Sequence, residues 1–170
     1  MTRYRKAEPP GSKFVTAEGA RRLRQELDYL WRVQRPQVTR AVSEAAAQGD
    51  RSENAEYLYG KKQLREIDRR VRFLRKRLEG MVVVSRPPDD RSRVFFGAWV
   101  RIEDEEGHEI EIRIVGPDEI EPARRYVCLD SPLARALMRK RTDEAVTVEV
   151  PGGRKTYVVT EVRYEEEERG

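Results

Sequence analysis

A heptad repeat spans residues 57–78 and constrains the fold more than any other feature of the chain. Its seam positions alternate in steps of three and four, in two series: Tyr57, Leu64, Val71 and Leu78, and Gly60, Ile67 and Leu74. Such a stripe is typical of a coiled-coil helix, which has to bury its seam against another helix. Residues 17–47 offer a partner, because apolar residues recur there at steps of three, four and seven: Leu23, Leu27, Leu30, Trp31, Val38, Val42 and Ala45. Two amphipathic helices joined by a few residues predict an antiparallel hairpin.

Capping and breaking residues set the expected ends of these helices. Thr16 is suited to cap the first helix, with Glu18 in its first turn, and Gly49 is suited to stop it. We expect the second helix to begin at about residue 52 and to end at Gly80. At ~1.5 Å per residue, the first helix would be ~45 Å long.

Two residues inside the helices are exceptions to the helical pattern. Pro36 removes one hydrogen bond of the first helix, which predicts a bend or a local loosening near Arg35. Gly60 costs the second helix roughly 1 kcal/mol of propensity relative to alanine. It either allows the partner helix to approach closely or softens that end of the hairpin.

From Met81 onward the apolar pattern changes to the period of β-strands. Residues 110–115 alternate cleanly, and turns rich in Gly and Pro separate further short apolar runs at 81–84, 94–96, 99–103, 126–129, 146–150 and 156–162. Ser131 and Pro132 are suited to begin a short helix that runs to about Met138. We therefore expect an α+β chain, with an N-terminal antiparallel coiled-coil hairpin over residues 14–80. A C-terminal domain over residues 81–164 would hold a small antiparallel β-sheet and one short helix.

Composition excludes several classes of protein. No apolar run approaches the ~18 residues of a membrane span, and the first residues lack the apolar stretch that a secretory signal needs. Cys128 is the only cysteine, so the chain forms neither an internal disulfide nor a cysteine-based zinc site. These features fit a soluble cytoplasmic protein with no membrane partner, and we expect a monomer.

Charge is unevenly distributed along the chain. Residues 1–80 hold 20 Lys and Arg against 11 Asp and Glu, a net charge of +9, whereas residues 81–170 hold 15 against 20, a net charge of −5. Residues 61–79 carry nine basic and three acidic side chains, an excess that balanced salt bridges on a solvated face would not need. This basic stripe predicts contact with a polyanion such as a nucleic acid, whose phosphates dominate affinity.

The turn between the two helices, residues 49–57, is polar and acidic. Asp50, Glu53 and Glu56 are spaced by three, and the first four residues from Asp50 also have the spacing of a capping box, in which Asp50 or alternatively Ser52 caps the second helix. A capping box does not need Glu56, whose charge adds repulsion on nearly the same face. A pair of carboxylates suits Mg²⁺, which prefers oxygen ligands and often takes only one or two from a protein.

Asp50 and Glu53 alone would make an incomplete metal site. We therefore expect weak Mg²⁺ binding by the isolated protein, and a shared ion once another protein supplies the remaining ligands. A second ion shared in this way would activate water in a two-metal cleavage of a phosphodiester.

Four blocks of the sequence are distinctive: residues 49–57 (GDRSENAEY), 64–72 (LREIDRRVR), 94–100 (VFFGAWV) and 130–137 (DSPLARAL). Together they resemble the Gre family of bacterial transcript cleavage factors, and the resemblance extends from about Phe14 to Tyr164. It implies that the coiled coil enters the secondary channel of RNA polymerase and that a C-terminal domain like the FK506-binding proteins (FKBP-like) docks on the channel rim. The protein would not itself be an enzyme. It would activate the polymerase's own Mg²⁺-dependent cleavage of the backtracked nascent RNA 3′ end.

The resemblance also implies roles for individual residues. Asp50 and Glu53 would be the catalytic acids that hold the Mg²⁺ shared with RNA polymerase. The other residues of the tip would contact the RNA or maintain the shape of the tip: Arg51, Ser52, Asn54, Glu56 and Tyr57. Longer extruded RNA would meet a basic patch formed by Lys61, Lys62, Arg65, Arg69, Arg70 and Arg72. The polymerase-docking loop would be Asp130, Ser131 and Pro132.

The two ends of the chain lie outside the resemblance. We expect residues 1–13 to form a mobile basic arm and residues 165–170 to form a disordered acidic tail.

Two other functions stay open on the sequence. The protein could regulate RNA polymerase by occupying the channel without stimulating cleavage, although the tip acids argue against this. Alternatively, the coiled coil could bind nucleic acid without polymerase. That function predicts salt-sensitive binding to free RNA that weakens when Arg69, Arg70 and Arg72 are lost.

Overall fold

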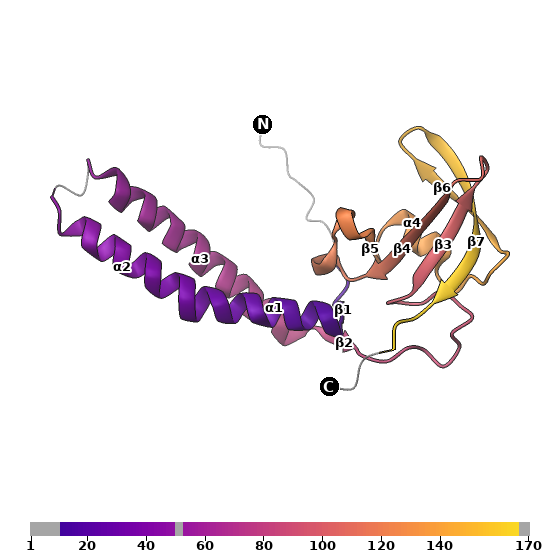
Figure 1. The fold of residues 1–170 in the computed structure, drawn as a ribbon, viewed down its shortest axis with the longest axis horizontal. Coiled ribbons are helices and arrows are strands. Elements are labelled where there is room, and N and C mark those ends of the chain that lie inside the picture. The colour runs from indigo at the N-terminus through magenta and orange to yellow at the C-terminus, as the bar shows by residue number, and fades with distance from the viewer. Residues whose placement is uncertain (1–10, 50–52, 167–170) are drawn as a thin grey trace, which may run out of the picture. The chain divides into compact units, whose positions relative to one another are not determined.

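The computed structural model describes residues 11–49 and 53–166. They form two compact units, one within residues 18–81 and one that combines the chain up to Ala17 with the chain from Val82 onward. The first unit is a helical hairpin and the second is built around a β-sheet (Figure 1). Within the described residues, no helix is both long and apolar enough to cross a membrane.

The helical unit is the predicted antiparallel hairpin. Its first arm runs without a break through α1 (Ala17–Tyr29), η1 (Leu30–Gln34) and α2 (Arg35–Ala46), and its second arm is α3 (Ala55–Gly80) (Figure 1). The heptad series supplies the buried face of α3, as Gly60, Ile67, Val71 and Leu74 show. The core of the hairpin joins Val38 to Ile67 and Val71, and the half-buried side chains packed against it are Leu27, Leu30, Val42 and Leu64.

The segment η1 is a widened, π-helical turn that ends two residues before Pro36. The Arg35 N–H donates to the Leu30 carbonyl oxygen, five residues back rather than four. Pro36 has no N–H to continue the ordinary pattern, so the helix accommodates it by loosening one turn. The backbone on both sides keeps right-handed helical angles. The predicted loosening near Arg35 is confirmed, and the helix continues through it.

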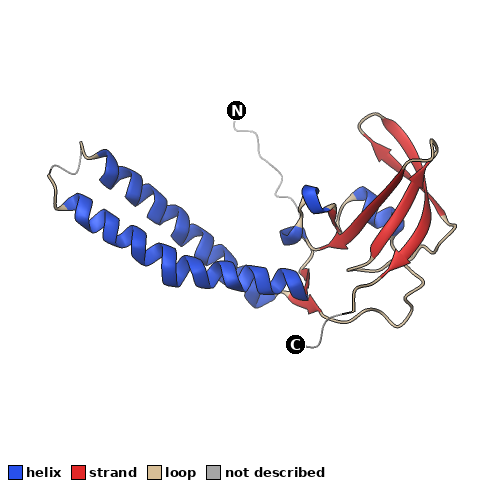
Figure 2. Cartoon of the chain, viewed as in Figure 1, coloured by secondary structure: helices blue, strands red, loops and turns tan. Residues whose placement is uncertain are grey.

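The second unit holds a five-stranded mixed sheet, whose strands are drawn as red arrows in Figure 2. The strand order of the sheet is β5-β4-β3-β7-β6. Its strands are β3 (Trp99–Asp104), β4 (Glu109–Val115), β5 (Tyr126–Cys128), β6 (Ala145–Val150) and β7 (Gly153–Arg163). All neighbours pair antiparallel except β4 and β5, which are parallel. The predicted antiparallel pairing therefore holds for four strands. It does not hold for β5, because the chain from β4 to β5 crosses over through two short 3₁₀ turns, η2 (Pro117–Glu119) and η3 (Pro122–Arg124), instead of a tight hairpin.

The single short helix of this unit is α4 (Pro132–Leu137), close to its predicted position. Its Ala134 and Leu137 are fully buried in the core of the sheet unit. The strands contribute alternating residues to the same core: Val100, Ile102, Ile112, Ile114, Val146, Val148, Tyr157 and Val159.

A small parallel pair, β1 (Phe14–Thr16) and β2 (Val82–Val84), completes the sheet unit. Glu119 holds β1 in place: its buried carboxylate accepts hydrogen bonds from the Thr16 N–H at 3.0 Å, from the Thr16 hydroxyl, and from the Gly116 N–H at 2.9 Å. The sequence-based boundary at residue 14 assigned Phe14–Thr16 to the hairpin. The structure instead groups them with the sheet, because their backbone pairs with β2 and with the Glu119 carboxylate.

Candidate functional site at the tip of the hairpin

The tip is closed by Asn54, which caps α3. Its backbone is extended, with φ −83° and ψ 100°, and its Oδ1 accepts a hydrogen bond from the Tyr57 N–H at 3.1 Å. Its Nδ2 donates to the Ala45 carbonyl oxygen of α2 at 2.7 Å. One side chain therefore starts the second helix and ties it to the end of the first. The predicted capping by Asp50 or Ser52 is wrong, because α3 begins later, at Ala55.

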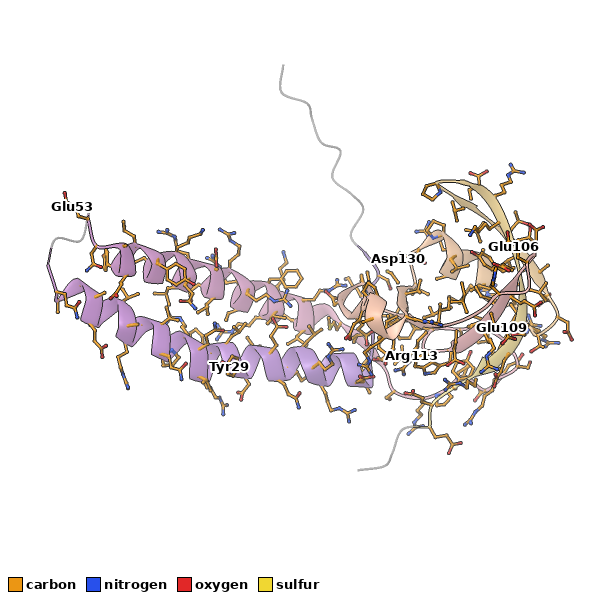
Figure 3. All side chains as sticks on the ribbon, turned by 45° about the horizontal axis from the view of Figure 1, so that its top comes forward. Tyr29, Glu53, Glu106, Glu109, Arg113 and Asp130 are labelled. Carbon is orange, nitrogen blue, oxygen red and sulfur yellow. The ribbon has the colours of Figure 1, made fainter. Side chains whose placement is uncertain are left out.

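Glu53 lies directly before this cap and is exposed (Figure 3). Its carboxylate makes no hydrogen bond or ion pair with any residue that the structure describes. Glu56 is exposed in the first turn of α3, where the helix dipole favours a negative charge. Residues 50–52 (Asp50, Arg51 and Ser52) lie outside the described residues, so the pairing of Asp50 with Glu53 stays a prediction.

Near the tip the two helices approach closely at Gly60. A Cβ on Gly60 would lie 2.7 Å from Cγ2 of Val42, well inside van der Waals contact. Of the two roles considered for this glycine, the structure supports the close approach. Tyr57 is half-buried beside it, with the Lys61 Nζ 5.5 Å from the centre of its ring. The tip thus rests on a narrow, tightly packed end of the hairpin.

Five residues of the predicted basic patch form an exposed basic face on α3. They are Lys61, Lys62, Arg65, Arg69 and Arg72, and none forms an ion pair with a described residue. Arg70 differs: its Nε and Nη2 lie 2.6 and 2.9 Å from the two carboxylate oxygens of Glu26 on α1. Because Glu26 matches its charge and the pair joins the two arms, we assign Arg70 to the hairpin rather than to the basic face.

The predicted docking loop lies at the start of α4. Ser131 is the N-cap of α4, as predicted, and its Oγ accepts from the Ala134 N–H at 3.2 Å. Asp130 is half-buried, and its Oδ2 accepts from the Ser12 N–H at 2.9 Å. Pro132 is exposed. Asp130 and Ser131 therefore shape the loop, while Pro132 presents its ring to solvent.

The contact of Ser12 also bears on the predicted N-terminal arm. Its last residues are held against the sheet unit, since Ser12 bonds to Asp130 and a Cβ on Gly11 would be in van der Waals contact with Pro117. Residues 1–10 lie outside the described residues.

One cluster of the described residues has metal-ligand chemistry, at the turn between β3 and β4. The ligand atoms of Asp104, Glu106 and His108 lie within 4.8 Å of one another. Hydrogen bonds of the turn already engage the Asp104 carboxylate: its Oδ1 accepts from the N–H groups of Glu106 and His108 at 3.0 and 2.8 Å. The bond from the His108 N–H is the main cause of the lowered pKa of Asp104. We interpret the cluster as a stabilised turn.

Sequence reasoning missed a second group of polar residues, on the sheet. Arg113 is the one buried arginine among the described residues, and it lies between Trp99, Tyr126 and Glu165. No local pattern indicates this group, because its members come from three strands and from the segment after β7.

Comparison with known proteins identifies the family. The model of the N-terminal domain of GreA and GreB transcription elongation factors matches residues 13–83, and the model of their C-terminal domain matches residues 88–164. The chain is 59% identical over 164 residues to the transcription elongation factor GreB of Pseudomonas aeruginosa, covering 96% of this chain and 98% of the relative. GreB of Yersinia pestis is 58% identical over 153 residues, 90% of each chain.

Solved structures give a weaker likeness. The crystal structure of GreA factor homolog 1 from Thermus thermophilus is 21% identical, with a TM-score of 0.40, over 88% of this chain and 97% of that one. The two family models cover both units, and the curated relatives span nearly the whole chain. The resemblance to the Gre family found in the sequence is thereby confirmed, and the chain belongs to the GreA/GreB family of transcription elongation factors.

Proposed function

We propose that this protein is a transcription elongation factor that inserts its helical hairpin into the secondary channel of RNA polymerase. There it stimulates the polymerase's own cleavage of the backtracked RNA 3′ end and so rescues arrested complexes. One observation carries the proposal: in a chain 59% identical to a GreB, the carboxylate of Glu53 is exposed at the tip and is not used by the fold within the described residues. The Glu53 carboxylate is therefore available to a ligand from outside the chain.

The donor set at the tip fits Mg²⁺. Glu53 offers the carboxylate oxygens that this ion prefers. These oxygens do not cap α3, because Asn54 is its N-cap. When bound at Glu53 and Asp50, the ion would be the second metal, which activates water for phosphodiester cleavage. Two carboxylates leave most ligand positions to water or to the polymerase, so the isolated protein holds the ion weakly.

Other parts of the chain bring the acids and the RNA together. Asn54 fixes the start of α3 relative to Ala45, and this positions Glu53. The basic face of α3 attracts the phosphates of the extruded RNA and guides its end toward the tip. Pro132, exposed at the start of α4, belongs to the loop that docks on the channel rim.

The experiment uses stalled, backtracked transcription complexes with Mg²⁺ and the Glu53→Gln variant. Glu44→Gln is the matched control, because it makes the same change of charge at an exposed residue near the tip end of the other arm, where no role is assigned. We expect the Glu53→Gln protein to bind the polymerase normally and to stimulate RNA cleavage roughly 10–100-fold less, the usual loss when a metal site is weakened. The control should retain most of the activity.

Other outcomes point to other functions. Unchanged cleavage with Glu53→Gln would refute the assignment of the acid. Wild-type protein that binds the complex but does not shorten the RNA would identify a regulator that only occupies the channel. Salt-sensitive binding to free RNA, without any requirement for polymerase, would identify a stand-alone nucleic-acid-binding coiled coil.

A further inference from the structure

The sheet unit binds a carboxylate of its own C-terminal segment through an indole and a buried arginine. Glu165 Oε1 accepts a hydrogen bond from Trp99 Nε1 at 2.8 Å, and Glu165 Oε2 lies 3.4 Å from Arg113 Nη2. The Arg113 side chain is only 9% exposed, whereas that of Glu165 is 50% exposed. The cationic side of this contact is therefore part of the fold, and the anionic side lies at the surface. Arg113 comes from β4 of the sheet unit (Figure 3).

The arginine is held in place by groups other than Glu165. Its Nη1 donates to the Tyr126 hydroxyl at 3.1 Å, and its Nε is 3.5 Å from the Gly97 carbonyl oxygen. Its Cζ lies 5.7 Å from the ring centre of Trp99 and 5.4 Å from that of Tyr126, and these two rings meet edge to face. A buried guanidinium is costly unless an anion compensates its charge. The site is thus pre-organised for a carboxylate.

A second arginine forms the wall of the site without competing for the ligand. Arg163 stacks on Trp99, with its Cζ 4.8 Å from the ring centre. Its charge is matched by Glu111, whose Oε1 lies 2.7 Å from Arg163 Nη2. The hydrogen bond from Arg163 is the main cause of the lowered pKa of Glu111. Arg163 is therefore paired with Glu111 within the sheet, and Arg113 is the cation that contacts the bound carboxylate.

Glu165 reaches the site because the preceding residue is anchored. The Tyr164 hydroxyl accepts from the Phe95 N–H at 2.8 Å and donates to the Arg93 carbonyl oxygen at 2.5 Å. Among the described residues, the next residue, Glu166, pairs only with Arg91, at 3.1 Å, and this pair is exposed. Of the four consecutive glutamates at residues 165–168, the structure thus shows the first one in the site. The predicted disordered tail is corrected at its first two residues, which contact the sheet unit.

We propose that Trp99 and Arg113 form a binding site for a carboxylate of an acidic peptide segment of a partner protein, which Glu165 occupies in the unbound chain. The indole N–H and the guanidinium would both bond to the incoming carboxylate, as they bond to Glu165 in the unbound chain. The half-exposed Glu165 leaves when the partner segment arrives. The sheet half of the chain has a net charge of −5, so the site is a local cation on an acidic background and selects its ligand by geometry. The site is separate from the tip acids and does not depend on the function proposed for them.

Fluorescence anisotropy with a labelled tetraglutamate peptide and the full chain tests this proposal. Glu165 is a tethered competitor, so Glu165→Gln should bind the peptide about tenfold more tightly than wild type, the range of one charge-assisted hydrogen bond. Glu166→Gln is the matched control, with the same change of charge in the adjacent residue, and should bind like wild type. A tetraglutamine peptide should bind none of the proteins.

A second variant tests the site itself. Trp99→Phe keeps an aromatic ring and the fold but removes the N–H, so in the Glu165→Gln background it should abolish the tenfold gain. The basic face of α3 is unchanged in that protein, and any peptide bound there remains as a weak, salt-sensitive background. Equal binding by the Glu165→Gln and Glu166→Gln variants, or a full gain in the absence of the indole, would overturn the proposal.

Discussion

Replacing Gly60 with alanine tests how closely the helices pack near the tip. Helix propensity alone would make the change stabilising by roughly 1 kcal/mol. The new Cβ, however, would lie 2.7 Å from Val42 Cγ2, and carbon atoms normally stay ~3.5–4.0 Å apart. Val42 is β-branched and in a helix holds essentially one χ1 rotamer, so its methyl group cannot turn away cheaply. Overpacking of this kind costs about 1–3 kcal/mol, which leaves a net destabilisation of about 1 kcal/mol.

The same change should have the opposite sign when Val42 is also shortened. Val42→Ala removes the methyl group that collides, so in that background Gly60→Ala should stabilise the hairpin by about 1 kcal/mol. The double-mutant cycle then gives a coupling of about 2 kcal/mol. Thermal unfolding of the full chain followed by far-UV circular dichroism measures it, and 1 kcal/mol corresponds to a Tm shift of about 4–8 °C for a unit of this size. Equal effects of Gly60→Ala in both backgrounds would refute the close approach.

Two further predictions concern the sheet unit. Gly116→Ala should destabilise the sheet unit by about 2–4 kcal/mol, because the new Cβ would collide with the Phe14 carbonyl oxygen, while Glu119 holds the two segments together. The backbone angles at this position, φ −76° and ψ 167°, suit any residue, so the collision alone causes the loss. Urea unfolding followed by tryptophan fluorescence measures it, and a fully stable variant would contradict the close packing of β1 against Gly116. Burial raises the pKa of Tyr164 to about 12, above its ordinary value near 10, so the stability from its protonated hydroxyl should be complete below about pH 10 and should be lost as the pH rises toward 12. The stability difference between wild type and Tyr164→Phe should therefore shrink over that window, and a constant difference would contradict the shift.

The hairpin could be derived from the sequence because its information is local. The spacing of Ile67, Val71 and Leu74 repeats within one segment, and these residues are buried in the structure. Pro36 likewise acts on its own turn, so the loosening at η1 follows from the chemistry of one residue. The N-cap role of Ser131 was predictable for the same reason, since a cap and its helix are neighbours in the chain.

The features that sequence reasoning missed depend on residues far apart in the chain. Thr16 and Glu119 are 103 positions apart, and nothing near either residue indicates that a buried carboxylate joins them. The parallel pairing of β5 likewise follows from the path of the chain between β4 and β5. The contact of Glu165 with Trp99 spans 66 positions, and four consecutive glutamates are more typical of a solvated tail.

The choice of cap at the tip decides whether Glu53 is available. Asp50, Ser52 and Asn54 are all good N-caps, so propensity cannot choose among them. Had Asp50 been the cap, Glu53 would have reached back to the backbone as the second half of a capping box. An aspartate at position 54 would cap as well as asparagine, but it would lack the Nδ2 donor that reaches the Ala45 carbonyl oxygen. It would also place another negative charge beside Glu53. A neutral side chain that both donates and accepts is therefore the one that closes the hairpin and leaves the Glu53 carboxylate free of bonds within the described residues.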